Sequence, residues 1–591
     1  MSNSRLSGIY SFGPAIMDEM TIFRAWAPSA ENVYLFLEGE KVPMRRQNEE
    51  FWEVSVEGDR TGSLYGFILD GEGPFPDPAG RFMPSGIEGL SQVIDTGRFR
   101  SDDRNWKGRD LREMVIYECH VGTISTRGNY EGLRKIAEHL TDTGINTVEI
   151  MPLAQFFGTR NWGYDGVYIY SPAACYGTPE DLRNTVSYFH EKGISVILDV
   201  VYNHSGFIGN YLDRFGPFHS PWHRTPWGNC FNLDGQYSDS VRKYILENVR
   251  YWIEDYCFDG LRLDAVHGIM DTSPRHILAD IGSLVEDLSR KLGRNIVAIA
   301  ETDQNDLKVT ECQKKCGYGI TGQWNDDFHH SVHTLLTGEN RSYYMDYGKP
   351  EDLSRTLRNG FDYDGRWSGH LKKTRGTSFG SADRSRLVVC SQNHDQIGNR
   401  AFGERLITLA GQRAAEQAAA LTLLSPFTPM IFQGEETGET NPFLFFVDTS
   451  DKKTAKSILE GRRKEFQSFG WQQDIPDPND PESFLRSKIN WAESKTRGRR
   501  EFSSLYKNLI ILRKKYVSGK TSDYEVSDDV RPIILSYRSG LKIAANFLDV
   551  SVPFREDVRE ILHDLPSAGE ISCLAHSPEG KIMKKGVLVY L

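Results

Sequence analysis

The hydrophobic and polar residues follow two different patterns along the chain, and the first pattern covers residues 1–105. Short apolar runs such as "TIFRAWAP", "NVYLFLEG", "FWEVSV" and "LYGFILDGEG" alternate there with turns rich in Gly, Pro and charged residues. Runs of this kind are typical of antiparallel strands, and no segment has the length and periodicity of a helix. We therefore expect an N-terminal β-sandwich domain, immunoglobulin-like in form, over residues 1–105.

From about residue 110 the pattern changes to short apolar strands that alternate with amphipathic helices. Eight such strands are predicted: "MVIYECHVG", "NTVEIMPLA", 195–204, 260–267, 295–302, 319–328, 386–395 and 428–436. Eight parallel strands with intervening helices close into a (β/α)8 TIM barrel. We expect this α/β barrel over residues 106–520, with insertions near 205–240 and 437–500 and a closing helix over 500–516. Strand-like runs then return and predict a C-terminal β-domain over residues 521–591.

Charged residues interrupt one predicted barrel strand, the stretch "FDGLRLDAVHGI" at residues 258–269. Side chains alternate along a strand, so Arg262 and Asp264 share one face while Leu261 and Leu263 share the other. Such a pair is either a buried structural ion pair or part of a site. Because the C-terminal ends of barrel strands build the active sites of this fold, the position favours a site.

Two further acids, Glu301 and Asp395, follow the fifth and seventh predicted strands. Cleavage of a glycosidic bond needs one carboxyl group that is protonated and one that is ionised. We expect Arg262 to keep Asp264 ionised, as a nucleophile requires. We expect burial to raise the pKa of Glu301, as a general acid requires. The third acid can help to position the sugar.

Other polar side chains also follow the predicted strands. The run "DVVYNH" provides Asp199, Asn203 and His204, and "QNHD" provides His394. Hydrogen-bond donors and acceptors thus lie at the ends of strands three, four, five and seven. An isolated structural ion pair does not explain this arrangement. Neutral imidazoles of the two histidines can hydrogen-bond to sugar hydroxyls.

Aromatic residues are frequent in the same loops. Tyr164, in "RNWGYDGVYIY", is expected to stack on a sugar ring. For Trp162, Trp222 and Trp227, sugar binding and core packing both remain open.

The segment "QWNDDFHHSVH" brings Asp326, Asp327, His329 and His330 together after the sixth strand. A metal site is conceivable, but a hydrogen-bonding loop of the active site is the simpler account. We therefore expect no metal and no cofactor.

Composition limits the partners. Asp and Glu outnumber Lys and Arg by 81 to 70, which gives a formal charge of −11 and argues against nucleic acid. No apolar run approaches the roughly 20 residues of a membrane span, and the start of the chain lacks a secretory signal, so we expect a cytoplasmic protein without membrane contact. The eight cysteines are scattered and are expected to be free thiols. The oligomeric state stays open.

The four segments "DVVYNH", "GLRLDAVH", "AIAET" and "QNHD", in this order, make the chain similar to the α-amylase superfamily, glycoside hydrolase family 13. The resemblance implies a retaining double displacement with Asp264 as nucleophile, Glu301 as general acid and base, and Asp395 as the carboxylate that stabilises the distorted sugar. Arg262, His204, His394 and Tyr164 would line the subsite of the attacked glucose, next to Asp199.

Within the superfamily the chain resembles members that release trehalose from maltooligosyl trehalose, a neutral oligosaccharide, by hydrolysis of the α-1,4 bond beside the terminal trehalose. Its N-terminal domain resembles the carbohydrate module of glycogen branching and debranching enzymes. A branching enzyme is the alternative function, and a sugar-binding protein that kept the barrel is a third. The resemblance also implies sugar contacts over three short runs: Arg262, Leu263, Ala265, Val266 and His267; Asp326, Asp327, Phe328, His329 and His330; His394, Gln396, Ile397, Gly398 and Asn399.

Overall fold

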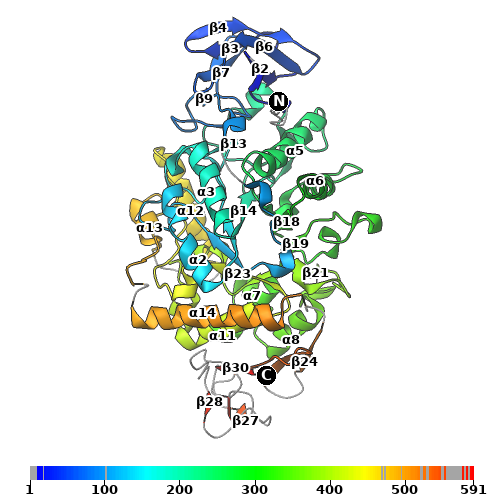
Figure 1. The fold of residues 1–591 in the computed structure, drawn as a ribbon, viewed down its shortest axis with the longest axis vertical. Coiled ribbons are helices and arrows are strands. Elements are labelled where there is room, and N and C mark those ends of the chain that lie inside the picture. The colour runs from blue at the N-terminus through cyan, green and yellow to red at the C-terminus, as the bar shows by residue number, and fades with distance from the viewer. Residues whose placement is uncertain are drawn as a thin grey trace.

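The computed structural model describes residues 10–17, 19–99, 103–467, 470–471, 474–493, 496–519, 523–527, 532–547, 552–553, 576–577, 581–582 and 586–590. The N-terminal strands lie at one end of the molecule, the barrel with its helices in the middle, and the strands nearest the C-terminus at the other end (Figure 1). The rest of the expected C-terminal β-domain lies outside the described residues.

The N-terminal region consists of two antiparallel sheets. One has the strand order β1 (Ala15–Met17), β2 (Met20–Trp26), β6 (Phe51–Glu57), β5 (Arg45–Arg46); the other has the order β4 (Glu40–Pro43), β3 (Val33–Leu37), β7 (Leu64–Leu69), β8 (Glu72–Phe75), with β9 (Ser91–Gln92) paired to β7. Burial alternates along β2 and β3, as in strands with one face on a core. The rings of Phe23 and Tyr65 meet edge to face between the sheets, 5.1 Å apart. The predicted sandwich is confirmed.

All eight predicted barrel strands form, and they close into one parallel barrel. In order around the barrel they are β10 (Ile116–Cys119), β11 (Thr147–Ile150), β14 (Ser195–Val200), β17 (Gly260–Leu263), β18 (Val297–Ala300), β19 (Gly322–Trp324), β22 (Leu387–Cys390) and β23 (Thr428–Phe432). Each pairs with its neighbours in sequence order, and β23 closes the circle on β10. The predicted TIM barrel is confirmed.

The sixth strand is shorter than predicted. The run 319–328 was expected to be a strand, but β19 ends at Trp324 and helix α7 (Asp326–Thr337) begins two residues later. Asp326 and Asp327 therefore occupy the first turn of a helix, where carboxylates are favoured by the unpaired N–H groups.

Helices cover the outside of the barrel. The main ones are α1 (Tyr130–Arg134), α2 (Ala137–Thr143), α3 (Pro179–Glu191), α5 (Ser238–Glu254), α6 (Ile277–Leu292), α8 (Pro350–Asn359), α11 (Gln412–Leu424) and α14 (Arg497–Tyr516); short ones are α4 (Leu212–Phe215), α9 (His394–Gly398) and α10 (Leu406–Ala410). Thr178 and Asp181 start α3 with a reciprocal capping box. The predicted closing helix is α14, which begins three residues earlier than expected.

The loops of the barrel contain short elements of their own. They are β12 (Ala154–Gln155) with β13 (Tyr168–Pro172), the hairpin β15 (His219–Arg224) with β16 (Asn229–Phe231), the hairpin β20 (Arg366–Ser368) with β21 (Lys373–Arg375), and helices α12 (Lys452–Gln467) and α13 (Pro481–Arg486). The insertions predicted near 205–240 and 437–500 contain the β15–β16 hairpin and the helices α12 and α13.

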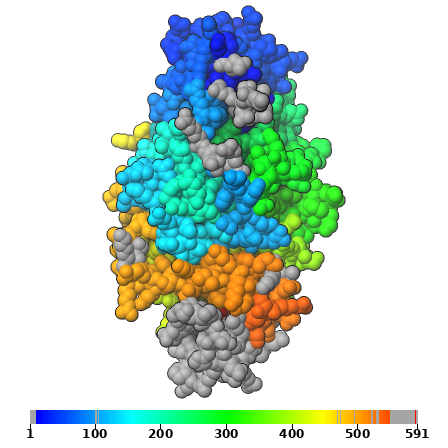
Figure 2. Space-filling model, viewed as in Figure 1, coloured from blue at the N-terminus to red at the C-terminus, as the bar shows by residue number. Residues whose placement is uncertain are grey.

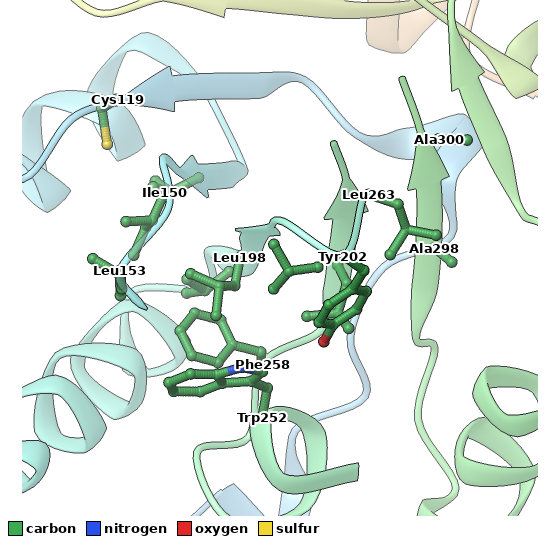
Figure 3. Close-up of a cluster of buried hydrophobic side chains, with 14 of the residues drawn as sticks. Cys119, Ile150, Leu153, Leu198, Tyr202, Trp252, Phe258, Leu263, Ala298 and Ala300 are labelled. Carbon is green, nitrogen blue, oxygen red and sulfur yellow. The ribbon is translucent and has the colours of Figure 1, made fainter. Parts of the chain in front are cut away.

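The main hydrophobic core lies between the barrel and its helices. Leu198 of β14 lies near Phe258 and Trp252 of α5, and Leu263 of β17 lies beside Ala298 of β18 (Figure 3). Each such leucine stabilises the fold by about 1.5–3 kcal/mol relative to an exposed one. Leu263 is fully buried in this cluster, so its side chain belongs to the core.

The barrel interior is also filled with side chains. Ile197, Ile299, Trp324, Val388 and Met430 form a second buried cluster there. Because side chains two residues further along a strand point the same way, the next inward layer toward the C-terminal ends is the polar one that contains the site.

Antiparallel strands end the described chain. Strands β24 (Tyr524–Ser527), β25 (Ile533–Tyr537), β26 (Lys542–Asn546) and β30 (Gly586–Tyr590) form one sheet, and β27 (Val552–Pro553), β29 (Lys581–Ile582) and β28 (His576–Ser577) form another. Tyr537 donates a hydrogen bond of 2.7 Å to the carbonyl of Leu424 at the end of α11. Within the described part of the chain, no helix is both long and apolar enough to cross a bilayer.

Candidate active site

The guanidinium of Arg262 is the centre of the polar layer. Its Nη1 lies 2.8 Å from Asp264 and 2.7 Å from Asp199, and its Nη2 lies 2.9 Å from Glu301. The guanidinium also sits over the ring of Trp324, 4.2 Å from the centroid. The predicted contact of Arg262 with Asp264 is present. The same cation also contacts Glu301, and the sequence interpretation did not include this second contact.

Asp264 follows β17 and is held from a second side. The side-chain amide of Asn203 donates hydrogen bonds to the Asp264 carboxylate at 2.7 Å and to its carbonyl at 2.8 Å. The Asp264 side chain keeps 12% of its surface exposed, while that of Arg262 has none. The free part of the carboxylate is therefore available to a substrate.

Asp199 is the buried anchor of this arrangement. It accepts a hydrogen bond of 2.6 Å from the hydroxyl of Tyr164 and two from Arg262. Burial raises the pKa of Asp199 to about 7, even though the charge of Arg262 acts to lower it. Asp199 and the Tyr164 hydroxyl bind each other and the guanidinium, so they fix Arg262.

Glu301 follows β18 and lies next to the turn after Asp264. The backbone N–H of Ala265 donates a hydrogen bond of 2.6 Å to the Glu301 carboxyl group. Ala265 has φ 37°, in the left-handed region that a non-glycine residue adopts only under constraint. Burial raises the pKa of Glu301 well above its usual range, and the negative charge of Asp264 adds to this while Arg262 opposes it.

His394 connects Asp395 to a buried acid that sequence reasoning missed. Its ring Nδ1 lies 2.5 Å from Glu118 of β10, and its Nε2 lies 3.5 Å from Asp395. Burial acts to lower the pKa of His394, but the charges of Asp395 and Glu118 and the hydrogen bond to Glu118 raise it to about 9. His394 was expected to be neutral; these neighbours make it a cation. Asn399 donates a hydrogen bond of 3.2 Å to Asp395.

Glu118 could have been found from its place in "MVIYECHVG", where it interrupts an apolar strand as Arg262 does in "GLRLDAVH". Tyr164 completes this side of the site. Its ring stacks on that of His394, with centroids 5.0 Å apart.

His204 and His267 flank an exposed tryptophan. The ring of Trp227 lies 6.3 Å from that of His204 and 6.0 Å from that of His267, and half of the Trp227 surface is exposed. The Nδ1 of His204 is in short contact with the Asn203 side chain. Burial lowers the pKa of His204, which keeps its imidazole neutral as expected.

The segment 326–330 divides between surface and core. Asp326 is partly exposed. The partial burial of its carboxyl group, together with the charge of Asp303, raises its pKa to about 7, although the charge of Arg375 acts to lower it. Asp327 is fully buried and accepts hydrogen bonds from Asn305 and Tyr347.

Both histidines of this segment and Phe328 are buried. His329 lies between the Ser391 carbonyl at 2.8 Å and the Tyr344 hydroxyl at 3.0 Å. Burial lowers the pKa of His330, whose ring lies 5.1 Å from that of Tyr347. Phe328 packs edge to face on Phe427. Of the five residues, Asp326 is the one that is partly exposed.

Several other expected sugar contacts lie in the packed interior. Leu263, Val266 and Ile397 are buried, as is Ala265 apart from its backbone N–H contact with Glu301. Gly398 lies against the ring of Trp162, where an added Cβ would come within 2.0 Å. Gln396 and Asn399 are partly exposed. The three short runs that were expected to contact sugar therefore contain both partly exposed residues and core residues.

The candidate tryptophans take different places. Trp162 is buried and stacks on Phe443, with centroids 5.3 Å apart, so it is a packing residue. Trp222 on the β15–β16 hairpin is 82% exposed.

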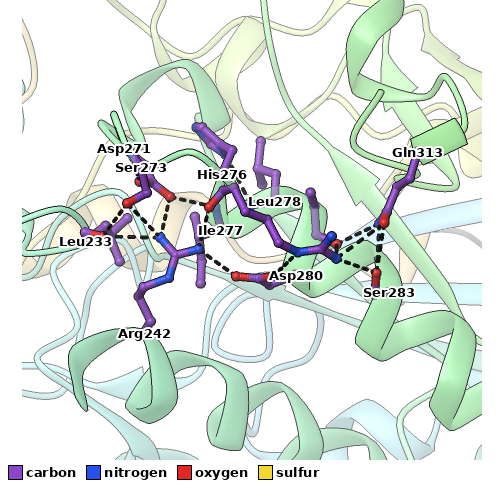
Figure 4. A network of polar contacts seen from close by, with 12 residues as sticks. Leu233, Arg242, Asp271, Ser273, His276, Ile277, Leu278, Asp280, Ser283 and Gln313 are labelled. Carbon is purple, nitrogen blue, oxygen red and sulfur yellow. Dashed lines mark hydrogen bonds and ion pairs between the residues drawn. The ribbon is translucent and has the colours of Figure 1, made fainter. Parts of the chain in front are cut away.

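A polar network anchors the loop that follows Asp264. Arg242 of α5 binds Asp271 at 2.6 Å and Asp280 of α6 at 2.5 Å (Figure 4). Asp271 in turn accepts hydrogen bonds from the backbone N–H groups of Ser273 and Ile277. The loop is thus tied to two helices, which holds the end of β17 in place.

The described residues contain no group of three His, Cys, Asp or Glu side chains placed to hold a metal ion. The chemistry available is that of the carboxyl groups. Two acids on neighbouring strands share one guanidinium, one with a raised pKa and one with an exposed edge.

A closed (β/α)8 barrel with this pair at the C-terminal ends of its strands defines a class of protein, the glycoside hydrolases. Residues 93–216 and 233–520 match the family model of the alpha amylase catalytic domain, and residues 11–81 match that of carbohydrate-binding module 48, the isoamylase N-terminal domain. The chain belongs to the α-amylase family of glycoside hydrolases, in the group formed by the malto-oligosyltrehalose trehalohydrolases.

The relatives support this placement. The chain is 43% identical over 507 residues to malto-oligosyltrehalose trehalohydrolase of Saccharolobus solfataricus, with 86% of this chain and 87% of the relative covered. It is 41% identical over 542 residues to the protein of the same name from Rhizobium sp., with 89% and 91% covered. A 1,4-alpha-glucan branching enzyme GlgB from Fusobacterium nucleatum is 29% identical over 347 residues, with 53% and 56% covered.

Solved structures show the same architecture. A crystal structure of a Salmonella typhimurium protein with the provisional name alpha amylase superposes with a TM-score of 0.90 at 34% identity, and covers 98% of this chain and 99% of its own. A pullulanase from Paenibacillus barengoltzii superposes with a TM-score of 0.70 at 17% identity, which shows a shared fold.

Proposed function

We propose that this protein hydrolyses the α-1,4-glucosidic bond next to the terminal trehalose of maltooligosyl trehalose, and so releases trehalose and a shorter maltooligosaccharide. The observation that carries the chemistry is the contact of one guanidinium, that of Arg262, with the carboxyl groups of both Asp264 and Glu301. The choice of substrate is supported by relatives that cover nearly the whole chain and are named for this reaction.

Asp264 is the nucleophile in this proposal. Arg262 and Asn203 stabilise its negative charge, and an edge of its carboxylate is exposed. In the first step an Asp264 oxygen forms a bond to the anomeric carbon while the glycosidic C–O bond breaks. Trehalose is the leaving group, and its glycosidic oxygen takes up a proton as it departs.

Glu301 supplies that proton. Burial raises its pKa well above the ordinary value, which favours the protonated form that a general acid needs. After it has given up the proton, the Glu301 carboxylate takes a proton from water, whose oxygen attacks the anomeric carbon and breaks the bond to Asp264. The sugar is released with its original anomeric configuration, and both acids return to their starting states.

Asp395 is proposed to stabilise the distorted sugar, with His394 and Asn399 holding its carboxylate. The side chains proposed to contact the substrate are those of the buried His204 and the partly exposed Tyr164, His267, Asp326, Gln396 and Asn399. The reaction needs no cofactor, because carboxyl groups and water supply every proton and bond.

The division into three domains, residues 1–105, 106–520 and 521–591, is part of the proposal. Family matches over 11–81 and over 93–216 and 233–520 support the first two domains. A cytoplasmic location is proposed from the sequence.

Product analysis tests the function. Purified protein is incubated with maltotriosyl trehalose and, separately, with maltopentaose, and the products are separated by chromatography. Release of trehalose together with maltotriose, at a much higher rate than any cleavage of maltopentaose, is the expected result. Failure to release trehalose would contradict the proposal. A shift in the iodine colour of amylose without free trehalose would indicate a branching enzyme instead.

A further inference from the structure

The N-terminal module, residues 10–99, contains the match to a family named for carbohydrate binding, over residues 11–81. Its tryptophan side chains are nevertheless used for packing. Its two tryptophans, Trp26 and Trp52, are 3% and 7% exposed. Among the described residues of the module, the large hydrophobic side chains that are exposed are Met17 and Leu64, neither of which is aromatic. A flat glycan-binding surface needs accessible aromatic faces, and the described part of this module presents half-buried rings such as Tyr34 and Phe36 but no exposed ring.

Several aromatic rings of the module face the barrel, while others such as Phe23 and Tyr65 pack between its two sheets. The space-filling view shows the blue N-terminal module seated directly on the barrel (Figure 2). Trp26 packs edge to face on Phe218, with centroids 4.8 Å apart and the rings at 87°. Phe67 packs on Phe215 in the same manner, at 6.0 Å.

Polar contacts fix the same interface. The indole N–H of Trp26 donates a hydrogen bond of 2.8 Å to Glu50, and the same carboxylate oxygen accepts one of 2.6 Å from Ser240 of α5. Glu50 thus connects the indole to the barrel. Phe75 adds a ring contact with Tyr211, at 5.2 Å.

The ring partners of Trp26, Phe67 and Phe75 all belong to one segment, residues 205–233, which begins directly after His204. Other rings of the module pack on α5 and the turn after it: Tyr10 on Tyr251, Phe12 on Tyr244 and Phe99 on Tyr256. The 205–233 segment continues into the β15–β16 hairpin. At its start, Ser205 and His219 are joined by a hydrogen bond of 2.7 Å. At its far end, the thiol of Cys230 contacts the Gly268 carbonyl at 3.8 Å.

The other side of the segment touches the site. Its Trp227 ring lies between those of His204 and His267. Asn203, one residue before His204, binds Asp264. The 205–233 segment is therefore held by the module on one side and borders the proposed nucleophile on the other.

We propose that the N-terminal module promotes catalysis by holding the 205–233 segment in place, with Trp26 as the positioning residue, and not by binding glycan on its own surface. The kinetic part of this inference rests on the proposed function. The geometric part, the placement of Trp227 and His204 by a contact between module and segment, stands without it.

The test compares five full-length variants, and a sixth that combines two of them. Trp26→Ala and Phe218→Ala remove the contact from its two sides, and Trp26→Phe keeps an aromatic ring there. The double variant Tyr34→Ala/Phe36→Ala removes the half-buried rings on the outer face of the module. Phe23→Leu, in the core of the module and away from the segment, is the control for a loss of stability alone.

Two readouts are measured: kcat and KM for trehalose release, and the affinity for maltohexaose by calorimetry on a Glu301→Gln background that leaves the glycan intact. A displaced segment is expected to lower kcat/KM and affinity by about tenfold in Trp26→Ala and Phe218→Ala, since misplacements of about 1 Å can cost up to 100-fold. The Trp26→Ala/Phe218→Ala double variant should lose no more than either single one. Trp26→Phe should recover most of the loss.

Unchanged affinity in Phe218→Ala, or a loss in Tyr34→Ala/Phe36→Ala, overturns the inference. A loss in Phe23→Leu equal to that in Trp26→Ala also overturns it, because general destabilisation would then suffice. If Trp26→Ala does not fold, Phe218→Ala decides. If wild-type protein releases no trehalose but Phe218→Ala still weakens maltohexaose binding, the proposed function fails and this inference stands.

Discussion

Glu118 binds His394 twice, through the ring Nδ1 at 2.5 Å and through the backbone N–H at 2.9 Å. Glu118 lies on β10, the first strand of the barrel, and His394 is the first residue of α9, which follows β22, the seventh strand. This pairing makes the imidazole a cation next to Asp395.

Replacement of Glu118 by Gln should lower the pKa of His394 from about 9, because one of its two anionic neighbours is lost. The pKa of His394 is raised above its ordinary 6.5, so its stabilising effect is complete below about that pH and is lost as the pH rises through about 9. In Glu118→Gln this alkaline loss should begin at a lower pH. Thermal unfolding across neutral and alkaline pH measures it, with the exposed Glu113→Gln as control. If the alkaline loss of thermal stability began at the same pH in Glu118→Gln as in the wild type, Glu118 would not be what raises the pKa of His394.

Arg262→Lys should lower kcat by about 100-fold or more, although it keeps the positive charge. A lysine ammonium is a single point and cannot span three carboxylates as the planar guanidinium does. Steady-state kinetics on maltotriosyl trehalose gives the loss, and circular dichroism checks the fold. Activity within a few-fold of the wild type would show that the bridging geometry is unimportant. The surface variant Arg290→Lys, at an exposed ion pair, should retain full activity.

Glu301→Gln should lose about 100- to 10,000-fold in turnover of the natural substrate, which needs a proton on its leaving oxygen. A glucosyl fluoride, whose leaving group needs little protonation, should still react with Asp264 in this variant. Asp264→Asn should be inactive on both substrates, because it lacks the nucleophile. The rate at which the glucosyl–Asp264 intermediate forms is compared for the two substrates, because the second step needs Glu301 as a base in both cases; equal losses in that first step would remove the acid role from Glu301.

The retaining mechanism predicts that the Asp264 and Glu301 carboxyl groups lie about 5 Å apart, and not the wider distance of an inverting enzyme. The newly formed reducing end should first appear as the α-anomer. Proton NMR during the first minutes of hydrolysis distinguishes the anomers before they equilibrate. An initial β-anomer would show that water attacks directly.

Arg242→Ala should destabilise the fold by about 3 kcal/mol, because Asp271, whose side chain has no exposed surface, would lose its cationic partner. Urea unfolding measures the change. The loop after Asp264 should also become more accessible to proteases. Arg290→Ala, at an exposed pair, should change stability little.

Much of the fold could be predicted from the sequence because its hydrophobic pattern is strong. The eight barrel strands and the N-terminal sandwich follow from short apolar runs between turns. The ends of the predicted strands and helices were less accurate. The sixth strand was predicted to continue to residue 328, but it ends at Trp324, and Asn325 and the two aspartates after it begin a helix. The amphipathic stretch between the first two barrel strands forms two helices, α1 and α2.

The site could be predicted only in part, because a motif does not show which side chains point inward. Asp264 and Glu301 are placed together as expected, but Leu263 and Phe328, neighbours in the same motifs, are in the core. Glu118 was missed because its partner His394 is 276 residues away in the sequence. Long-range pairs of this kind become visible only when the barrel closes.

The Arg262 guanidinium has a consequence for how the site titrates. Asp199 and Glu301 both contact this one positive charge, so a proton taken up by one of them changes the affinity of the other for protons. Apparent pKa values from a pH–rate profile will therefore belong to the group of acids and not to single residues. Substitutions within this group should likewise be non-additive, so the acids of this enzyme will have to be studied as one unit.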